Sequence, residues 1–358
     1  MKRLFSILSM MVLSTNLMAQ SWVERAEKFD DDFYRTNEAI RIADNLLLYQ
    51  HTTGAWPKNI DFTKPLNEQE KAVVIQSKSD INESTIDNRA TTTEVLYLSH
   101  IYQATGNEKY KDAALAGINY LLEAQYDNGG WPQFWPRPKG YYTHITYNDN
   151  AMVNVMKLMR DASKRKAPFQ YLSDEVAERC KRSFDLGITC ILNTQIRQND
   201  TLKVWCAQHD EHTLQPAKAR AYELPSFSAA ESCGITLLLM GISKPSQAII
   251  DAVEGSVAWL KATQLEGIRV EFFTNEQGKR DRRVVNCSEE ESCPPIWARF
   301  YTLDTCRPFF CGRDGVVRYN LSEIELERRV GYGWYTDKPR EVLKKYEQWK
   351  KKLKSRKK

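Results

Sequence analysis

Residues 125–151, QYDNGGWPQFWPRPKGYYTHITYNDNA, are the stretch that decides how this chain folds. The pair Gly129-Gly130 permits backbone angles that a side chain would forbid, and three prolines keep the connection out of a helix. Two tryptophans and four tyrosines lie between two segments with helical periodicity. The stretch is therefore a long aromatic loop whose shape is set by its own residues.

This loop has two interpretations. Its rings can form a small hydrophobic cluster beneath an ordinary connection. Alternatively, they can form one wall of a cleft, where Trp131 and Tyr147 present flat faces to a sugar ring and Asn148-Asp149-Asn150 supply polar ligands. The cleft is favoured because the pattern recurs elsewhere in the chain.

The recurrence has a period near 70 residues. A helical segment ends in glutamine, and a loop with tryptophan follows, at Gln50 and Trp56, Gln125 and Trp131, and Gln195 and Trp205; a fourth helix ends at Gln264. We expect these helices at residues 38–49, 109–124, 177–192 and 248–262, with others at 90–103, 151–162 and 229–240 and strands at 268–274 and 316–319. A two-helix repeat of this length predicts an all-α fold, a toroid of helical hairpins with long loops and a few short strands.

The two ends of the chain differ from its body. Residues 1–19 have a basic start, an apolar centre and a small residue at Ala19, which predicts a secretory signal cleaved there. No stretch is long and apolar enough for a membrane span. We expect a secreted or periplasmic protein with one domain at 20–337 and a basic, solvated, partly helical tail at 338–358.

The net charge of +5 comes from the ends. The tail has eleven Lys or Arg and two Glu, and the signal adds two more basic residues, so the body is acidic. An acidic body argues against nucleic acid as a partner. The tail is either a solvated end or a weak attractor for an acidic polymer.

The eight cysteines of this exported chain are even in number. Cys287 with Cys293, and Cys306 with Cys311, lie close enough in loop-like sequence to form local disulfides. The other four lie in apolar, helical contexts and could equally be buried free thiols. The pairing itself does not follow from sequence.

Two aspartates lie in polar turns that precede helices, Asp87 and Asp149. Each could simply cap its helix. Because the two occupy places that look equivalent, they could instead hold a hard cation such as Ca²⁺, or act as the acid and base of a glycosidase.

Residues 205–223 are dense in hydrogen-bond donors, and Gln208, His209, Lys218 and Arg220 could all face an anionic ligand. A metal site built on His209 and His212 is less favoured than a structural histidine. Arg299 lies among aromatic residues, where it is either a stacked structural residue or a clamp for a carboxylate.

Taken together, these strings resemble the pectate lyases of polysaccharide lyase family 10. The strings are TIDN at 85–88, GGWPQ at 129–133, ITYNDN at 145–150, WCAQHD at 205–210, PA–AR–YE at 216–223 and WARFY at 297–301. The resemblance covers about residues 39–335. The chain departs from it at Ala55, where the family has a second glycine, and at Arg89, where a glycine is commoner.

The resemblance implies an (α/α)₃ toroid and a Ca²⁺-dependent, endo-type β-elimination on polygalacturonate that leaves 4,5-unsaturated products. It also implies residue roles: Asp149 as a calcium ligand, Asp87 as a second acidic residue of the metal site and the catalytic cleft, Arg220 as the base and Arg299 as a second carboxylate binder. We expect a monomer. A base role for arginine requires a locally depressed pKa, because arginine stays protonated in nearly all proteins.

Two alternatives belong to other classes of protein. A uronate-specific glycoside hydrolase would use Asp87 and Asp149 as acid and base without calcium. A non-catalytic pectin-binding protein would use the aromatic loops alone. The ultraviolet absorbance of unsaturated products separates a lyase from both.

Overall fold

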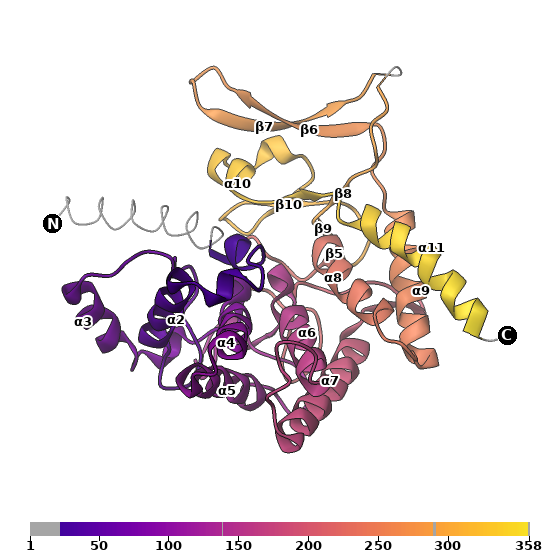
Figure 1. The fold of residues 1–358 in the computed structure, drawn as a ribbon. Helices are drawn as coiled ribbons and strands as arrows, with labels where there is room; N and C mark the ends of the chain where they lie inside the picture. The colour runs from indigo at the N-terminus through magenta and orange to yellow at the C-terminus, as the bar shows by residue number, and fades with distance from the viewer. Residues whose placement is uncertain (1–21, 138, 289–290, 357–358) are drawn as a thin grey trace. The chain divides into compact units, whose positions relative to one another are not determined.

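The computed structural model describes residues 22–137, 139–288 and 291–356, so the expected signal segment 1–19 lies outside the described residues. Its helices are α2 (Asn37–Tyr49), α3 (Glu68–Ser77), α4 (Thr92–Thr105), α5 (Glu108–Glu123), α6 (Ala151–Ser163), α7 (Asp174–Thr194), α8 (Ala229–Met240), α9 (Gln247–Ala262), α10 (Leu326–Gly331) and α11 (Pro339–Arg356) (Figure 1). In the described part of the chain, none of them is long and apolar enough to cross a membrane.

The strands pair two by two, always antiparallel: β1 (Ile145–Thr146) with β4 (Gln208–His209), β2 (Arg197–Gln198) with β3 (Thr201–Leu202), β5 (Phe227–Ser228) with β9 (Phe300–Tyr301), β6 (Ile268–Thr274) with β7 (Arg280–Asn286), β8 (Trp297–Ala298) with β12 (Tyr335–Thr336), and β10 (Phe310–Cys311) with β11 (Val317–Arg318). All of them are two residues long except β6 and β7. Helix therefore dominates, as predicted, and each helix predicted from the repeat is present.

One helix that sequence periodicity did not predict is α3. It begins with a capping box, in which the Asn67 side chain accepts from the Glu70 backbone and the Glu70 carboxylate accepts from Asn67. Among its residues only Val74 is buried. A helix that buries so little has no apolar stripe to reveal it.

The chain divides into two compact units, one formed by residues up to Thr143 with Asn154–Ile188, the other by His144–Val153 with Thr189–Lys358. We describe each by itself. The first unit contains α2, α3, α4, α5 and most of α6 and α7, and the second contains the paired strands and α8 to α11.

The glutamines of the repeat tie each loop to the next hairpin. Gln125 Nε2 donates to the carbonyl of Gly129 in its own loop (3.0 Å) and to that of Ser183 in α7 (2.9 Å). The same two bonds join Gln50 to Gly54 and Ala113, and Gln195 to Lys203 and Ala252. Each loop tryptophan donates its indole N–H to the helix before it, Trp56 to Leu46, Trp131 to Leu121 and Trp205 to Ile191. Each repeat of the sequence pattern therefore corresponds to the same glutamine clamp, a side-chain amide that donates to one carbonyl in its own loop and one in a neighbouring helix.

Glycine is required where loop and helix meet. Gly129 has φ +89°, and a Cβ there would lie 2.1 Å from the Leu186 carbonyl oxygen of α7. Gly187, the next residue along that helix, lies against Met156 and the Trp131 ring. The loop at residues 125–151 can therefore pack against α7 only because glycine, which has no side chain, occupies both contact positions.

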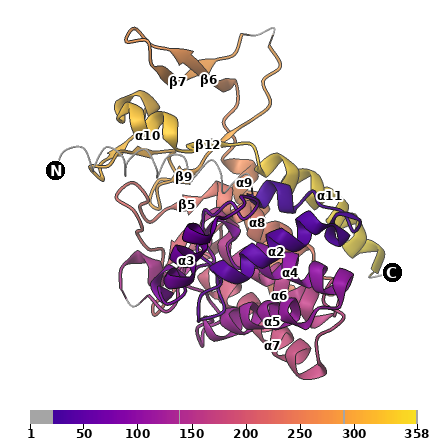
Figure 2. The same ribbon diagram turned by 60° about the vertical axis from the view of Figure 1, so that its left-hand side comes forward.

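In the second unit, an aromatic cluster forms the core beneath the short strands, with Tyr222, Phe300, Phe310, Tyr332 and Trp334 among its members. The β6–β7 hairpin lies beside α10 in both views of the ribbon (Figures 1 and 2). Its Asp281 forms an ion pair with Arg329 of α10.

The basic tail is more ordered than its charge suggested. Residues 339–356 form α11, which packs on α8 and α9 through buried Val342, Tyr346 and Trp349. These apolar residues return every three or four positions, so they share one face of the helix while the lysines occupy the other. The expectation of a solvated, partly helical end is corrected to a docked helix.

Of the two local disulfides that the sequence spacing allowed, Cys287–Cys293 is formed. Cys306 and Cys311 are both free, and the four other cysteines are buried free thiols. Cys311 belongs to the aromatic cluster, where its burial raises the pKa of the thiol to about 11. The second local disulfide that the spacing allowed is therefore not formed.

Candidate active site

Two tight turns hold the predicted aspartates. In the first unit the turn Asp87–Arg89 has its middle residue, Asn88, at φ +51°; in the second unit the turn Asn148–Asn150 has Asp149 at φ +49°. Asn and Asp adopt this left-handed backbone more readily than other side chains. Matching the turns by this feature places Asp87 opposite the first residue of the second turn. The predicted equivalence of the two aspartates is therefore wrong by one position.

The second turn points Asp149 outward. The N–H groups of Tyr147 and Asn148 both donate to the Ala207 carbonyl, 2.9 Å in each case, where β1 meets β4. At the apex of the turn, the Asp149 side chain keeps 48% of its surface exposed. Asn148 Nδ2 donates to one of its carboxylate oxygens at 2.9 Å.

Arg299 anchors the centre of this site. Its backbone N–H donates to Trp334 O and its carbonyl accepts from Ala229 N, which fixes the residue between neighbouring strands. Its guanidinium donates to Asn148 Oδ1 (3.0 Å) and to Glu231, and lies 3.5 Å from Asp149 Oδ1. With a side chain 10% exposed, Arg299 serves to position these partners.

Glu231 is a site residue that sequence reasoning missed. It stands three residues after Ser228 at the start of α8, a spacing that reads as a capping box. The Ser228 side chain makes no cap bond; its hydroxyl donates to the Glu231 carboxylate, which also pairs with Arg299. The local cap signal hid a buried ion pair between residues 68 positions apart.

Arg220 lies over the same aromatic ring as Arg299. Arg220 Nε donates to Glu223 Oε2 at 2.7 Å, and the Tyr332 hydroxyl donates to the other oxygen of that carboxylate, also at 2.7 Å. The Tyr332 ring centre lies 4.7 Å from the Arg299 guanidinium carbon and 5.7 Å from that of Arg220. The structure thus brings together the two arginines that the sequence singled out, and Arg220 is the accessible one, with 41% of its side chain exposed.

The pKa values of both arginines are raised, not depressed. For Arg220, burial works against the charged form, but the hydrogen bond and charge of Glu223 outweigh it and raise the pKa. For Arg299, the charge of Glu231 likewise outweighs burial. In the same way, Arg220 overcomes the effect of burial and lowers the pKa of Glu223.

Two of the predicted donors take different places. Lys218 is exposed. His209 is fully buried; its Nδ1 pairs with Leu214 O at 2.9 Å, its Nε2 accepts from Cys206 N at 3.1 Å, and burial lowers its pKa to about 4. Both ring nitrogens of His209 are hydrogen-bonded, so the expected substrate contact is corrected to a structural role in its loop. For the same reason His209 has no nitrogen left to bind a metal together with His212.

The aromatic residues expected to face a sugar also lie in the core. Trp131 has no exposed surface, and its indole N–H donates a hydrogen bond to a backbone carbonyl of α5. Tyr147 is equally buried, and its hydroxyl lies 2.7 Å from Thr194 Oγ1. Both expectations of direct sugar contact are therefore wrong, because the rings fill the space between helices.

Asp87 lies in the first unit, where it pairs with Lys58. Its side chain is 5% exposed, and its Oδ1 is buried without a hydrogen-bond partner among the described residues. A cation or a donor from a ligand would satisfy that oxygen.

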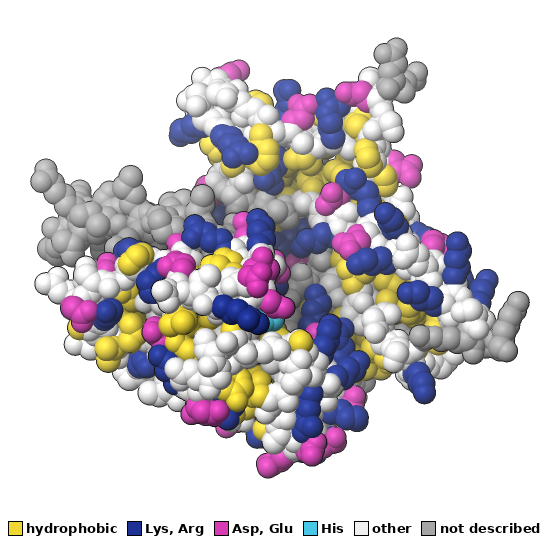
Figure 3. Space-filling model, viewed as in Figure 1, with side chains coloured by type: hydrophobic (Ala, Val, Ile, Leu, Met, Phe, Trp, Pro, Cys, Tyr) yellow, Lys and Arg dark blue, Asp and Glu magenta, His cyan; other side chains and the backbone are white. Residues whose placement is uncertain are grey.

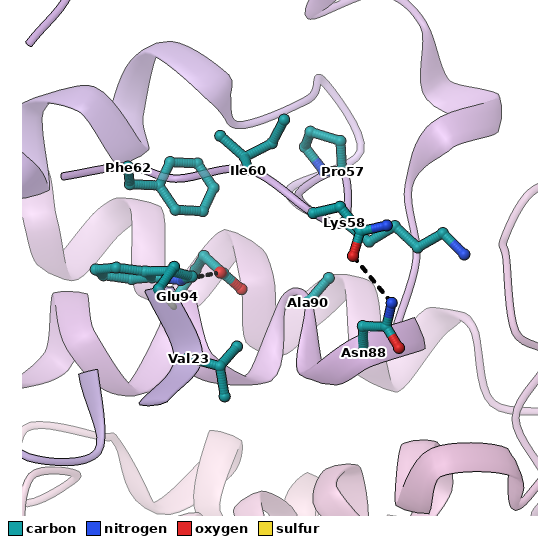
Figure 4. Close-up of a pocket in the computed structure, with 10 residues that line it drawn as sticks. Val23, Pro57, Lys58, Ile60, Phe62, Asn88, Ala90 and Glu94 are labelled. Atoms are coloured by element: carbon teal, nitrogen blue, oxygen red, sulfur yellow. Dashed lines mark hydrogen bonds between the residues drawn. The ribbon is translucent and has the colours of Figure 1, made fainter. Parts of the chain in front are cut away.

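Near Asp87 is a small cavity of 10 Å³, with Lys58, Asn88, Ala90 and Glu94 in its wall (Figure 4). Glu94 is buried at the start of α4 and accepts from the Trp22 indole N–H at 2.8 Å. Burial is the largest influence on this carboxyl and raises its pKa to about 7.

The residues present suit a hard cation. Asp149 has an exposed carboxylate whose Oδ1 has only a long contact with Arg299, and oxygen ligands of this kind are those that Ca²⁺ prefers. A second group that could hold a metal is His144, Asp210 and Glu211 in the second unit. There, His144 Nδ1 already lies 2.8 Å from Glu211 Oε2, and Asp210 Oδ1 accepts three bonds from its own turn.

A sequence model of the family described as pectic acid lyase matches residues 50–343. The chain is also similar to two solved structures, the Family 10 polysaccharide lyase from Cellvibrio cellulosa and an aspartate-to-alanine mutant of it in complex with trigalacturonic acid. Both are 34% identical with a TM-score of 0.75 and cover 92% of this chain, matched over 95% and 96% of their own. No curated protein matches. The likeness confirms the predicted fold class, an all-α toroid of helical hairpins.

Proposed function

The chain belongs to the pectic acid lyases of polysaccharide lyase family 10, and we propose that it cleaves polygalacturonate by Ca²⁺-dependent anti β-elimination, leaving 4,5-unsaturated oligogalacturonides. The observation that carries this proposal is the pair of arginines over the Tyr332 ring, Arg220 and Arg299, with Asp149 3.5 Å from Arg299. Such a cluster suits the reaction, because removal of the C5 proton of a uronate builds negative charge on its carboxylate.

Each residue of the candidate site has a separate role in this proposal. Arg220 is half exposed and takes the C5 proton, while the exposed Lys218 binds a uronate carboxylate. Arg299 is buried, so its contribution is to hold Asn148 and Asp149 in place and to supply positive potential from beneath. Asp87, in the first unit, is a further acidic group, and its Oδ1 has no hydrogen-bond partner among the described residues.

Ca²⁺ would be held by Asp149, and when bound it would neutralise part of the uronate charge. Asp87, in the first unit, is the other candidate ligand that the sequence suggests. Asp149 fits this role because its turn is held by backbone bonds and its carboxylate faces solvent.

A base role for Arg220 must overcome its ion pair with Glu223, which favours the protonated form. A uronate carboxylate beside Arg220 would favour the protonated form in the same way as Glu223. Release of the Arg220 proton would therefore need the positive charge of a bound cation nearby, together with alkaline pH. The export signal at 1–19, a secreted or periplasmic location and a monomeric state complete the proposal.

The test is an assay of purified protein on polygalacturonate with calcium or with a chelator, read by the ultraviolet absorbance of the C4–C5 double bond. We expect absorbance to rise with calcium and to stop with chelator. Arg220→Ala should lose at least 100-fold in kcat, roughly the effect of removing a general base. Asp149→Ala should shift the calcium titration to higher concentration.

Arg307→Ala serves as the matched control, since this arginine stacks on an exposed tyrosine in the same unit. Reducing ends without absorbance would indicate a hydrolase, and binding without product would indicate a pectin-binding protein. Either result, or Arg220→Ala with full turnover, would overturn the proposal.

A further inference from the structure

The β6–β7 hairpin carries an aromatic ring into solvent. Phe272 on β6 is 47% exposed. Two arginines of the opposite strand lie over this ring, Arg280 with its guanidinium carbon 3.9 Å and Arg282 4.6 Å from the ring centre. Dark-blue basic and yellow hydrophobic side chains accordingly gather on the hairpin in Figure 3.

The positive charge of this face is not neutralised from within. Arg280 has no acidic partner among the described residues, and Arg282 donates only to backbone carbonyls. The nearby carboxylates are occupied elsewhere: Asp281 pairs with Arg329, and Glu271 with Arg269 and Arg283. An aromatic ring flanked by unpaired guanidinium groups suits a ligand that combines apolar ring faces with carboxylates.

The hairpin is also joined to the site. Arg282 donates to Tyr332 O at 2.7 Å and to Val330 O at 3.3 Å. The guanidinium groups of Arg299 and Arg220 lie over the Tyr332 ring, so Tyr332 links the exposed face of the hairpin to the candidate active site. Both lie in the second unit.

From these contacts we infer that Phe272, Arg280 and Arg282 form an accessory polyuronate surface, which holds a polygalacturonate chain beyond the sugars that react. The inference rests on the proposed function for the identity of the polymer. It gives the enzyme a second point of attachment, which helps only a chain long enough to reach both.

The test compares long polygalacturonate with trigalacturonate as substrates for Phe272→Ala and Arg280→Gln. We expect KM for the polymer to rise about fivefold in each variant, with kcat unchanged and both constants for the trimer unchanged, because one exposed cation–aromatic contact is lost. Tyr319→Ala is the aromatic control, since Tyr319 is 41% exposed beneath Arg307. Lys351→Gln on α11 is the charge control. Neither control should change KM.

An equal change for polymer and trimer, or no change for either, would overturn the inference. So would wild-type sedimentation as a dimer that Phe272→Ala dissociates, because the face would then belong to a second copy. Electrophoresis through gels that contain polygalacturonate measures binding without turnover. Retardation lost in the hairpin variants supports the surface even if no elimination occurs, which separates its failure from that of the proposed function.

Discussion

At the scale of single residues, the site is governed by how two arginines differ in exposure. Arg299 is enclosed by Glu231 and Asn148, so it cannot follow a substrate, whereas Arg220 retains an open side and a single carboxylate partner, Glu223. The same side-chain type therefore supplies fixed potential in one place and an adjustable group in the other.

Glu223→Gln should shift the alkaline rise of kcat toward lower pH. The carboxylate favours protonated Arg220, so its neutral isostere lowers the pKa of the guanidinium and frees the base form at lower pH. The measurement is kcat on polygalacturonate across pH 7 to 11.

Glu327→Gln is the control for this variant, because it removes a carboxylate that pairs with Arg313 and Arg328 instead. Its profile should match the wild type. If Glu223→Gln left the alkaline limb in place, deprotonation of Arg220 would not set that limb.

At the scale of elements, the repeat is held by polar clamps rather than by apolar faces alone. A glutamine such as Gln125 satisfies two backbone carbonyls that packing would otherwise leave buried and unpaired. This explains why glutamine, rather than a residue of equal size, closes each helix.

Gln125→Ala should lower the free energy of unfolding by about 2–3 kcal/mol. Two hydrogen bonds are lost, and the carbonyls of Gly129 and Ser183 are left without a donor. Urea denaturation followed by circular dichroism measures the change. Gln277→Ala, on the exposed turn of the hairpin, should change stability by less than about 0.5 kcal/mol. Equal stability of the two variants would refute the clamp.

At the scale of the whole molecule, sequence could predict what repeats. The spacing of Gln50, Gln125 and Gln195 gave the helices and the fold class because the clamps recur with the same period. Sequence could not decide whether Trp131 is a buried core residue or an exposed ring that stacks on a sugar. An aromatic ring after two glycines is compatible with both roles. The exposure of the Trp131 ring depends on how α5 and α7 pack against it, and the sequence of the loop alone does not specify that packing.

Residues of the candidate site could be singled out where they stood in distinctive strings, as with Arg220 and Arg299, which the structure brings together over one ring. Glu231 was hidden by a cap-like spacing, and its partner lies 68 residues away. The register of Asp87 against Asp149 depended on a backbone angle that neighbouring Asn residues adopt equally well. Long-range pairing and local backbone conformation are therefore the two physical facts that the pattern left open.

Stability of the whole molecule should depend on two buried groups that act in opposite directions. Glu94, with a folded pKa of about 7 against an ordinary 4.5, stabilises the fold below pH 4.5 and loses this effect as pH rises through 7. His209, at about 4 against 6.5, stabilises it above pH 6.5 and loses this effect as pH falls through 4.

Glu94→Gln should therefore raise the free energy of unfolding at pH 8 by about 2–3 kcal/mol and leave it nearly unchanged at pH 4. The amide stays neutral, so the cost of burying a carboxylate disappears, while its oxygen still accepts from Trp22. Urea titrations at both pH values measure the difference. Glu68→Gln, at an exposed position at the start of α3, is the control and should change stability by less than about 0.5 kcal/mol at either pH. A gain of equal size at pH 4 and pH 8 would show that packing, not ionisation of Glu94, sets its contribution.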